Sequence, residues 1–310
     1  MKHKCLYCYK ELATETDFHE KCSLTFFGTK EAPKLEYTFD QMAELAKNVV
    51  ERSVSVPGVQ PKLSMTFNDE AKDQRLTVVG ALGGNYIFKP PSLDFPEMPA
   101  NEHLTMRLAE YLKIQTVPSS LIRLKSEELS YITKRIDRTE TDKKIHMLDM
   151  FQITEAFDKY KSSMEKVGNA LGQFSSNTLL DKLFLFELTI FSFLSGNNDM
   201  HLKNFSMIES NSGWLLSPAY DLLNVAIANP DDTEELALTL SGKKRKFKKE
   251  HFVNFGEVLG LTSKQINTVF KRFLNKKEDL IKIIHNSFLS EKMKQNYIDV
   301  LLKRYSIINE

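Results

Sequence analysis

The sequence predicts an α+β fold in two parts, a smaller β-rich part over residues 1–137 and a larger helical part over residues 138–310. Two observations carry this prediction. Short segments that alternate apolar and polar residues, separated by turn residues, dominate the first part. Stretches with apolar residues at helical spacing, above all 177–194 and 263–310, dominate the second. Strands followed by helices are typical of an α+β architecture.

The elements of the first part are expected in a simple order. Residues 1–36 are expected to be irregular, and a helix is predicted over 39–50 because its apolar residues recur every three or four positions. A second amphipathic helix is predicted over 101–112, after an extended, proline-rich connector at 90–99. Five segments read as strands: 63–67, 76–80, 85–90, 121–124 and 130–136.

Composition restricts the class of protein. The 310 residues leave room for two domains, and a net charge of +1 does not by itself indicate a nucleic-acid partner. No charge-free apolar run is long enough to cross a membrane, and the first residues lack the apolar block of a signal peptide. The 3 cysteines, an odd number, do not make a disulfide framework. We therefore expect a cytoplasmic protein.

The most informative segment is SGNNDMHLKNFSM at 195–207, directly after the long apolar helix. Asn204 follows Asp199 at the fifth position, and a second acid, Asp221, comes after a short apolar stretch. This is the layout of a protein-kinase phosphotransfer site, in which the first Asp orients the attacking hydroxyl group while the Asn and the second Asp hold Mg²⁺ on the phosphates. The alternative is a polar loop that ends a buried helix.

Two basic residues lie inside this segment. Lys203 is expected to neutralise charge that develops on the transferred phosphoryl group. His201 has two interpretations, either a group that takes part in the site or a hydrogen-bonding residue that holds the loop.

A site of this kind needs further parts upstream. Lys89 in YIFKP is the expected strand lysine that contacts the ATP phosphates, and Glu102, which opens the next predicted helix, is its expected acidic partner. An exposed surface pair is the ordinary alternative. The segment YITKRIDR at 131–138 is a candidate hinge that presents backbone groups to adenine. The loop SVSVPGVQPK at 53–62 is the candidate phosphate-binding loop, but its single glycine also fits an ordinary polar turn.

Two features lie outside this site. Cys5-x-x-Cys8 together with His19 and Cys22 could supply four ligands to Zn²⁺, and the alternative is small apolar cysteines in a folded N-terminal segment. The run KKRKFKK at 243–249 is either a solvated loop or a contact for an acidic partner, such as a tRNA-bearing complex or operator DNA.

Six segments in one order resemble the HipA family of serine/threonine kinases, the toxins of bacterial toxin–antitoxin systems: SVSVPGVQPKLSM, NYIFKP, NEHLTMRLAEYL, YITKRIDR, SGNNDMHLKNFSM and LSPAYDLLN. The resemblance implies a bilobal protein-kinase-like fold of the HipA type, with Asp199 as the catalytic residue and with Asn204 and Asp221 as Mg²⁺ ligands. The implied ATP-binding residues are Lys89, Glu102, Ser53, Ser55, Val56, Gly58, Gln60, Lys62, Lys134, Arg135, Ile136, His201 and Lys203.

The resemblance also implies regulation of the phosphate loop. Ser53 and Ser55 are the implied autophosphorylation sites, and their modification is expected to inhibit ATP binding because each phosphate adds roughly −1.5 to −2 charge. Two positions depart from the family pattern. Lys134 stands where longer HipA kinases have an acidic residue, and His103 stands where an aromatic residue is also common.

Longer HipA proteins carry an additional N-terminal subdomain before the phosphate loop, and a loop that begins at Ser53 leaves no room for it. The chain is therefore similar to the short HipT kinases of tripartite HipBST systems, in which that subdomain is a separate protein, HipS, accompanied by a DNA-binding HipB. The resemblance implies a HipS-like and a HipB-like partner, indirect or weak contact with DNA, and no membrane. It implies an aminoacyl-tRNA synthetase, the tryptophanyl enzyme, as substrate.

We therefore expect Mg·ATP-dependent phosphorylation of a serine of that synthetase, which would stall translation and arrest growth. Two other classes stay open. One is a kinase that acts on a small hydroxylated metabolite or antibiotic, because the same phosphotransfer motif serves that chemistry. The other is a non-catalytic corepressor that works through its antitoxin, although the intact Lys89, Asp199, Asn204 and Asp221 argue against it.

Overall fold

The computed structural model describes residues 3–52, 62–68, 75–80, 84–91, 93–139, 141 and 143–309. The chain divides into two compact units: unit 1 contains residues 1–103, 117–143 and 286–289, and unit 2 contains residues 104–116, 144–285 and 290–310. This division differs from the single break predicted after residue 137. The reason is that helix α3 (Met98–Tyr111) begins in unit 1 and continues in unit 2, after which the chain returns to unit 1 for two strands.

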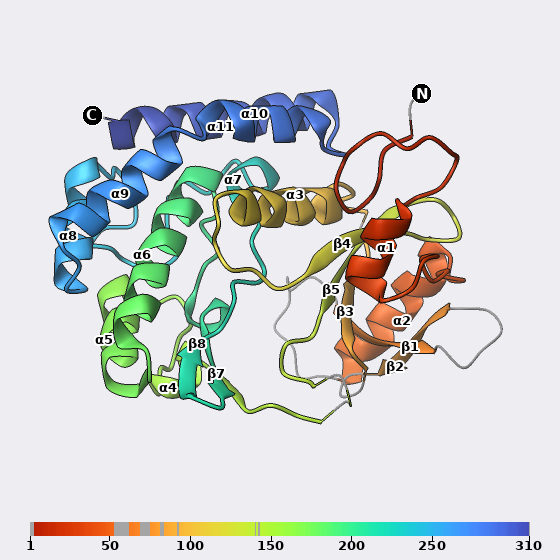
Figure 1. Ribbon diagram of the computed structural model, residues 1–310, viewed down its shortest axis with the longest axis horizontal. Coiled ribbons are helices and arrows are strands. Elements are labelled where there is room, and N and C mark those ends of the chain that lie inside the picture. The colour runs from red at the N-terminus through yellow and green to blue at the C-terminus, as the bar shows by residue number, and fades with distance from the viewer. Residues whose placement is uncertain are drawn as a thin grey trace. The chain divides into compact units, whose positions relative to one another are not determined.

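Unit 1 is built on a five-stranded antiparallel sheet with the strand order β2-β1-β3-β5-β4 (Figure 1). The strands are β1 (Leu63–Asn68), β2 (Arg75–Gly80), β3 (Tyr86–Lys89), β4 (Ser119–Arg123) and β5 (Leu129–Lys134). Each overlaps one of the five predicted segments. The burial of β3, β4 and β5 is nearly continuous rather than alternating, as in strands that are covered on both faces.

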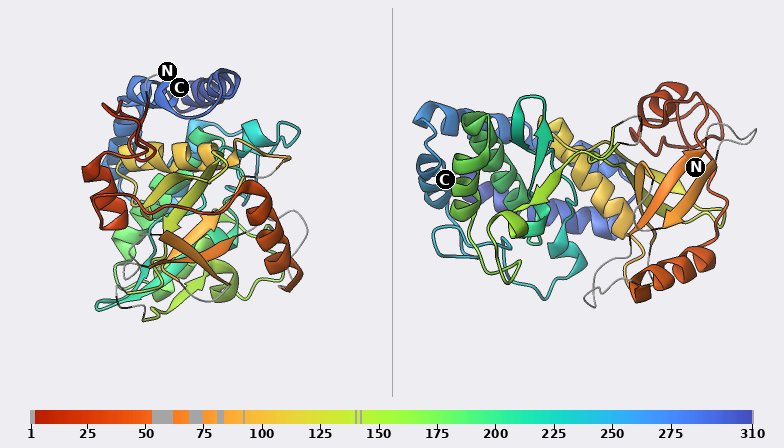
Figure 2. Two further views of the ribbon diagram at one scale, coloured as in Figure 1. Left: turned by 90° about the vertical axis from the view of Figure 1, so that its right-hand side faces the viewer. Right: turned by 90° about the horizontal axis from the view of Figure 1, so that it is seen from below.

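Helices α1 (Glu20–Phe27) and α2 (Phe39–Arg52) share one hydrophobic core with this sheet (Figure 2). The core joins side chains of both helices to all five strands or their ends: Phe26, Phe27, Leu35, Met42, Leu63, Met65, Leu76, Tyr86, Phe88, Ile122, Leu124 and Ile132. The expectation that residues 1–36 are irregular was wrong, because they contain α1. This helix has only 8 residues, too few for a helical period to show in the sequence.

Unit 2 surrounds a buried helix, α6 (Thr178–Ser195), which confirms the helix predicted over 177–194. Every residue from Leu185 to Ser195 is buried. Helix α6 contacts four elements: α5 (Met164–Phe174), α8 (Lys249–Val258), α11 (Glu291–Asn309) and strand β8 (Gly213–Leu216). Helices α9 (Ser263–Leu274), α10 (Lys277–Asn286) and α11 account for the predicted helical pattern after residue 263.

A small antiparallel sheet in unit 2 was not predicted. It has the order β6-β7-β8, with β7 (Ser206–Ser210) between β6 (Met147–Asp149) and β8. Its strands contain 3, 5 and 4 residues, and none of them alternates between buried and exposed residues. Short helices α4 (Met150–Ile153) and α7 (Val225–Ala228) follow β6 and β8 along the chain.

Arg304 of α11 fixes the C-terminal end of α6. Its Nη1 atom donates hydrogen bonds to the backbone oxygens of Phe193 at 2.7 Å and Glu235 at 3.2 Å. The guanidinium group also lies 4.8 Å from the centre of the Phe193 ring. Burial lowers the pKa of Arg304, and its guanidinium group gives the Phe193 carbonyl near the end of α6 a second donor beside the Gly196 N–H.

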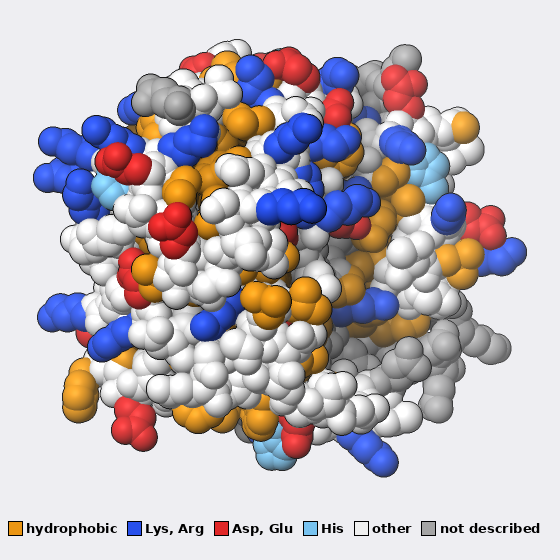
Figure 3. All heavy atoms as spheres, turned by 60° about the vertical axis from the view of Figure 1, so that its left-hand side comes forward, with side chains coloured by type: hydrophobic (Ala, Val, Ile, Leu, Met, Phe, Trp, Pro, Cys, Tyr) orange, Lys and Arg blue, Asp and Glu red, His pale blue; other side chains and the backbone are white. Residues whose placement is uncertain are grey.

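The surface carries both signs of charge. Figure 3 shows Lys and Arg side chains lying among Asp and Glu side chains on the same face, in keeping with the net charge of +1. Among the helices of the described residues, none combines the length and the apolar character needed to cross a membrane.

Gly196 ends α6 in a backbone conformation that suits glycine, with φ +75°, and a Cβ atom there would lie 2.5 Å from Oδ1 of Asn224. Gly260 has a similar φ of +82°, with no described atom within 4 Å of the corresponding position. We expect Gly260→Ala to lower the free energy of unfolding by about 1–2 kcal/mol through backbone strain. Gly196→Ala should cost a further amount of about 1–3 kcal/mol through overpacking. Urea unfolding of both variants measures the difference, and equal losses would contradict the close contact.

Candidate functional site

The β7–β8 hairpin carries the two predicted magnesium ligands at one of its ends. The strands pair Met207 with Leu216, and the backbone N–H of Ser217 donates to Ser206 at 2.8 Å. Asn204 ends a short 3₁₀ helix just before β7, and Asp221 follows shortly after β8. Since the start of one antiparallel strand lies beside the end of the next, the polar residues before and after the hairpin leave it at the same end.

Asp199 is held by its own loop, with its side chain 41% exposed. Its backbone oxygen accepts hydrogen bonds from the His201 backbone N–H at 2.8 Å and from Nδ2 of Asn204 at 2.9 Å. The Asn204 side chain is buried, and this bond orients its amide group, which leaves Oδ1 as the atom suited to bind a cation. The Asp199 carboxylate is therefore accessible while the backbone beneath it is fixed.

Tyr160 contacts Asp199 directly and was not predicted from the sequence as a site residue. Its hydroxyl group donates a hydrogen bond to Oδ1 of Asp199 at 2.8 Å. Burial, and then the hydrogen bond to Asp199, raise the pKa of Tyr160 further above its usual value, and the hydroxyl group is the donor in this contact. The two residues are 39 positions apart in the chain, and no local pattern in the sequence marks such a contact.

His201 is buried beneath the loop. Its ring packs edge-on against the Tyr160 ring with 5.0 Å between centres, and its Nε2 atom lies 4.0 Å from Oδ1 of Asp199. Burial lowers the pKa of His201, while the carboxylates of Asp199 and Asp221 act in the opposite direction. Both predicted functional acids are thus close enough to influence one imidazole ring. The Nδ1 atom of His201 is buried without a hydrogen-bond partner among the described residues, so both interpretations of His201 stay predictions.

Lys203 is exposed, and its Nζ atom lies 4.8 Å from the centre of the Phe151 ring. Its backbone oxygen accepts a hydrogen bond of 2.9 Å from the Tyr220 hydroxyl group, which also lies 2.5 Å from Oγ of Ser206. Tyr220 immediately precedes Asp221 and therefore links the two segments that carry the predicted magnesium ligands. Tyr220 was not predicted from the sequence as a site residue.

In unit 1, Lys89 and Glu102 form a buried ion pair. Nζ of Lys89 lies 2.6 Å from Oε1 of Glu102, and the two side chains are 5% and 1% exposed. Lys89 follows the core residue Phe88 on β3, so its side chain leaves the opposite face of the sheet. Nζ also lies 5.4 Å from the centre of the ring of its cross-strand partner Tyr131. The alternative of an exposed surface pair was therefore wrong.

The predicted hinge residues are already engaged within unit 1. The backbone N–H of Lys134 donates to the backbone oxygen of Pro118 at 3.0 Å, and that of Arg135 donates to the backbone oxygen of Asn85 at 2.9 Å. The Lys134 ammonium group lies 5.8 Å from the centre of the Phe26 ring. An adenine ring bound here would therefore depend on Ile136 and on backbone carbonyl groups, rather than on the first two amides.

Arg135 itself is fixed by a carboxylate. Its guanidinium group donates to both oxygens of Asp137, at 2.8 Å and 2.6 Å, and this hydrogen bonding lowers the pKa of Asp137. Most of the predicted phosphate loop lies outside the described residues, namely Ser53, Ser55, Val56, Gly58 and Gln60. Its last residue, Lys62, is described and is exposed.

The basic run at 243–249 is an anchored surface loop. Phe247 is 3% exposed and packs against Phe193 and Phe252, and Lys244 forms an ion pair of 3.1 Å with Glu234. A surface pocket is lined by Thr233, Glu234, Lys243, Lys244, Arg245 and Lys246. These contacts agree with the solvated-loop interpretation, and contact with an acidic partner stays a prediction.

The strand lysine paired with a helix glutamate, together with the Asp-x-x-x-x-Asn loop and the second Asp, define a kinase-like protein. Solved structures share the fold. HipA of Shewanella oneidensis, from a complex with HipB and operator DNA, has a TM-score of 0.69 at 21% identity. The matched region covers 85% of this chain and 70% of the HipA chain. The Helicobacter pylori proinflammatory kinase CtkA has a TM-score of 0.56 at 15% identity and covers 79% of this chain and 93% of its own.

Residues 54–281 match the model of the HipA-like C-terminal domain, and the chain belongs to this family. A Haemophilus influenzae protein that is named as a candidate kinase is 29% identical to this chain over 285 residues. The match covers 82% of this chain and 80% of that protein. The serine/threonine-protein kinase toxin HipA of Shewanella oneidensis is 24% identical over 208 residues, or 60% of this chain and 46% of its own length. The chain is a HipA-like kinase, and its closeness to HipT stays a prediction.

A double-mutant cycle tests the buried ion pair. We expect Lys89→Met and Glu102→Leu each to lower the free energy of unfolding by about 3–5 kcal/mol, because each leaves the other charge buried without its partner. The double variant should lose much less than the sum of the two. Lys125 is the matched control, since its ion pair with Glu36 is exposed, and Lys125→Met should cost at most about 1 kcal/mol. Additive losses for Lys89 and Glu102 in urea unfolding would contradict the coupling.

Proposed function

We propose that this chain is a Mg·ATP-dependent serine/threonine protein kinase of a bacterial toxin–antitoxin system. It acts in the cytoplasm on a serine of an aminoacyl-tRNA synthetase, the tryptophanyl enzyme, and so stalls translation. One observation carries the chemistry: Asp199 is accessible and hydrogen-bonded to Tyr160, and its loop also orients Asn204. Membership of the HipA-like family supports the same activity.

Asp199 would orient the attacking hydroxyl group and accept its proton late in phosphoryl transfer, so it needs no unusual basicity. The Tyr160 hydroxyl group occupies one side of the carboxylate and restricts its rotation. The remaining oxygen, Oδ2, is the one that would meet a substrate serine. Lys203 would add positive charge near the transferred phosphoryl group.

The donor set before and after the β7–β8 hairpin fits Mg²⁺. Oδ1 of Asn204 and the carboxylate of Asp221 are hard oxygen ligands, the kind that Mg²⁺ prefers. Asp221 has φ +59°, an uncommon conformation for a residue with a side chain, and such strain is concentrated at functional sites. When bound there, Mg²⁺ would neutralise phosphate charge. These two residues would hold the ion, and Tyr220 keeps their segments together.

Lys89 would contact the ATP phosphates. Its charge is maintained in a buried environment by Glu102, so a cation is available without a penalty at the moment of binding. Among the hinge residues, Ile136 is the strongest candidate to contact adenine, because the N–H groups of Lys134 and Arg135 already have acceptors.

The partners in this proposal come from relatives. HipA of Shewanella oneidensis was solved with HipB and operator DNA, which supports a DNA-binding antitoxin as partner of this chain too. The proposal of a HipS-like partner and of the synthetase as substrate rests on the resemblance of the sequence to short HipT kinases. Contact of this chain with DNA is proposed to be indirect or weak.

Phosphoproteomics after brief expression tests the activity and the substrate together. We expect a new phosphoserine on the synthetase and, with purified protein, an Asp199→Asn variant that transfers phosphate at least about 10²-fold more slowly. Asp231→Asn is the matched control, because Asp231 is an exposed aspartate outside the site, and it should keep full activity. A phosphorylated small molecule in the lysate, with no protein product, would replace the proposal by a metabolite kinase. Full toxicity of Asp199→Asn would indicate a non-catalytic module.

Regulation by the phosphate loop is a separate part of the proposal and rests on the sequence alone. Replacing Ser53 and Ser55 by Asp should weaken ATP binding, because negative charge on that loop repels the phosphates. Replacement by Ala should leave ATP affinity nearly unchanged and abolish phosphorylation of the loop. Nucleotide titration and mass spectrometry measure the two effects. Tight ATP binding by the Asp variants would contradict the proposal that phosphorylation of the loop inhibits ATP binding.

A further inference from the structure

The N-terminal segment brings together a set of metal-ligating side chains far from the phosphotransfer motif in the chain. The Sγ atoms of Cys5, Cys8 and Cys22 and a ring nitrogen of His19 all lie within 4.8 Å of one another. All 3 cysteines of the chain belong to this cluster, and their thiols are free rather than joined in disulfides. The cysteines predicted as possible ligands are thus assembled by the fold.

We propose that this cluster is a structural zinc site. The Nδ1 atom of His19 lies 3.5 Å from Sγ of Cys8 and 3.8 Å from Sγ of Cys22. Ligands placed tetrahedrally around Zn²⁺, at about 2.3 Å for sulfur and about 2.0–2.1 Å for nitrogen, are separated from one another by about 3.5–3.8 Å. The two separations of His19 from the cysteine sulfur atoms are therefore close to the edges of a zinc tetrahedron. Three cysteines and one histidine fill all four positions, which is typical of a structural rather than a catalytic zinc ion.

The second nitrogen of His19 supports this assignment. Its Nε2 atom lies 3.0 Å from the backbone oxygen of Glu11. A carbonyl oxygen only accepts, so Nε2 carries the proton and Nδ1 has its lone pair directed to the two sulfur atoms. Metal-binding histidines usually donate their other N–H in this way to a carbonyl or carboxylate group. The carbonyl group thus selects the tautomer that binds a metal.

The backbone supplies the two halves of the cluster in different forms. Cys5 and Cys8 lie in a tight turn, in which the Cys5 N–H donates to Lys10 and the Tyr9 N–H donates to Cys5, both at 2.9 Å. His19 is the N-cap residue of α1, and Cys22 lies in its first turn. Thiolates are favoured beside a helix N-terminus because the amide groups there carry partial positive charge.

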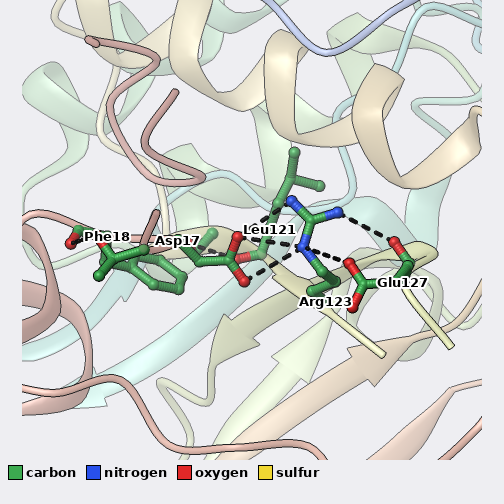
Figure 4. Close-up of polar contacts among 7 residues, drawn as sticks. Asp17, Phe18, Leu121, Arg123 and Glu127 are labelled. Atoms are coloured by element: carbon green, nitrogen blue, oxygen red, sulfur yellow. Dashed lines mark hydrogen bonds and ion pairs between the residues drawn. The ribbon is translucent and has the colours of Figure 1, made fainter. Parts of the chain in front are cut away.

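The segment that carries the cluster has little regular structure, although Phe26 and Phe27 of α1 pack into the core of unit 1. Apart from α1, its residues form a short bridge between Lys4 and Glu11 and irregular turns. It is attached to β4 by polar contacts: Figure 4 shows Arg123 donating to Asp17, with the Nε and Nη2 atoms each 3.1 Å from Oδ1. The Leu121 N–H also donates to Leu6 at 3.4 Å. A bound metal ion is a common means of stabilising a segment this small.

The turn also connects the cluster with α3. Tyr9 directly follows Cys8 and takes φ +65°, which is uncommon for a residue other than glycine. In this conformation its hydroxyl group lies 2.9 Å from Nδ1 of His103. His103 neighbours Glu102, the partner of Lys89. The zinc ion would therefore fix the turn that holds Tyr9 against the start of α3.

Metal analysis of the full chain, purified without chelators, tests the proposal directly. We expect one equivalent of zinc, three thiols that react with a thiol reagent only after the metal is removed, and a lower melting temperature in the presence of a chelator. Cobalt exchanged into the protein should show the charge-transfer and visible absorption of a tetrahedral site with thiolate ligands. Metal-free protein with three reactive thiols, a disulfide, or iron in place of zinc would overturn the assignment.

Variants identify the ligands. Cys8→Ser and Cys22→Ser should each lose most of the zinc, and chelator should no longer shift their melting temperatures. His3→Gln is the matched control, because His3 is an exposed histidine of the same segment, and it should keep its zinc. If the cysteine variants do not fold, the thiol and cobalt measurements on the unaltered chain still decide. Zinc retained by folded Cys→Ser variants would overturn the proposal. None of these readouts depends on kinase activity.

Discussion

The arrangement of unit 1 depends on the buried ion pair between Lys89 and Glu102. Removing two charges from water costs several kcal/mol for each ion, and the cost is recovered only while the two groups stay in contact. Strand β3 and the start of α3 must therefore keep one relative position. The sheet consequently has two unlike faces, because Phe88 points into the core under α1 and α2 whereas Lys89 points to the other side. His103 attaches the N-terminal segment at the same place.

Unit 2 holds an accessible polar loop at the end of a buried apolar helix. Gly196 ends α6, and its carbonyl group accepts hydrogen bonds from Val225 and Ala226 at 3.0 and 3.1 Å. Arg304 satisfies the Phe193 carbonyl group from the other side. The segment that follows therefore starts from a fixed point, and the β7–β8 hairpin fixes where it ends. Asp199 lies between the end of α6 and the β7–β8 hairpin along the chain, so its side chain is accessible while both ends of its loop are fixed.

A feature could be predicted from the sequence when it arises from a few consecutive residues, and not when it arises from contacts between distant parts of the chain. Strands such as LSMTF at 63–67 were recognisable because one buried face produces alternation, and the chemistry of the loop with Asp199 and Asn204 lies within six residues. The sheet of unit 2 was missed because its short strands do not alternate between buried and exposed residues. Tyr160 was missed because its contact with Asp199 is formed only by the folded chain. The position of Glu102 was predictable, but its burial at 1% exposure was not.

The conformation of Tyr9 restricts how this segment can change during evolution. A left-handed backbone costs a residue with a side chain roughly 1–2 kcal/mol, so glycine would relieve strain at this position. Glycine would also remove the ring that lies 5.5 Å from Phe288 and the hydroxyl group that meets His103. A substitution that makes the turn more comfortable would thus detach it from α3. The tolerated replacements are those that keep a long side chain with a polar end, a narrower set than the geometry of the turn alone would allow.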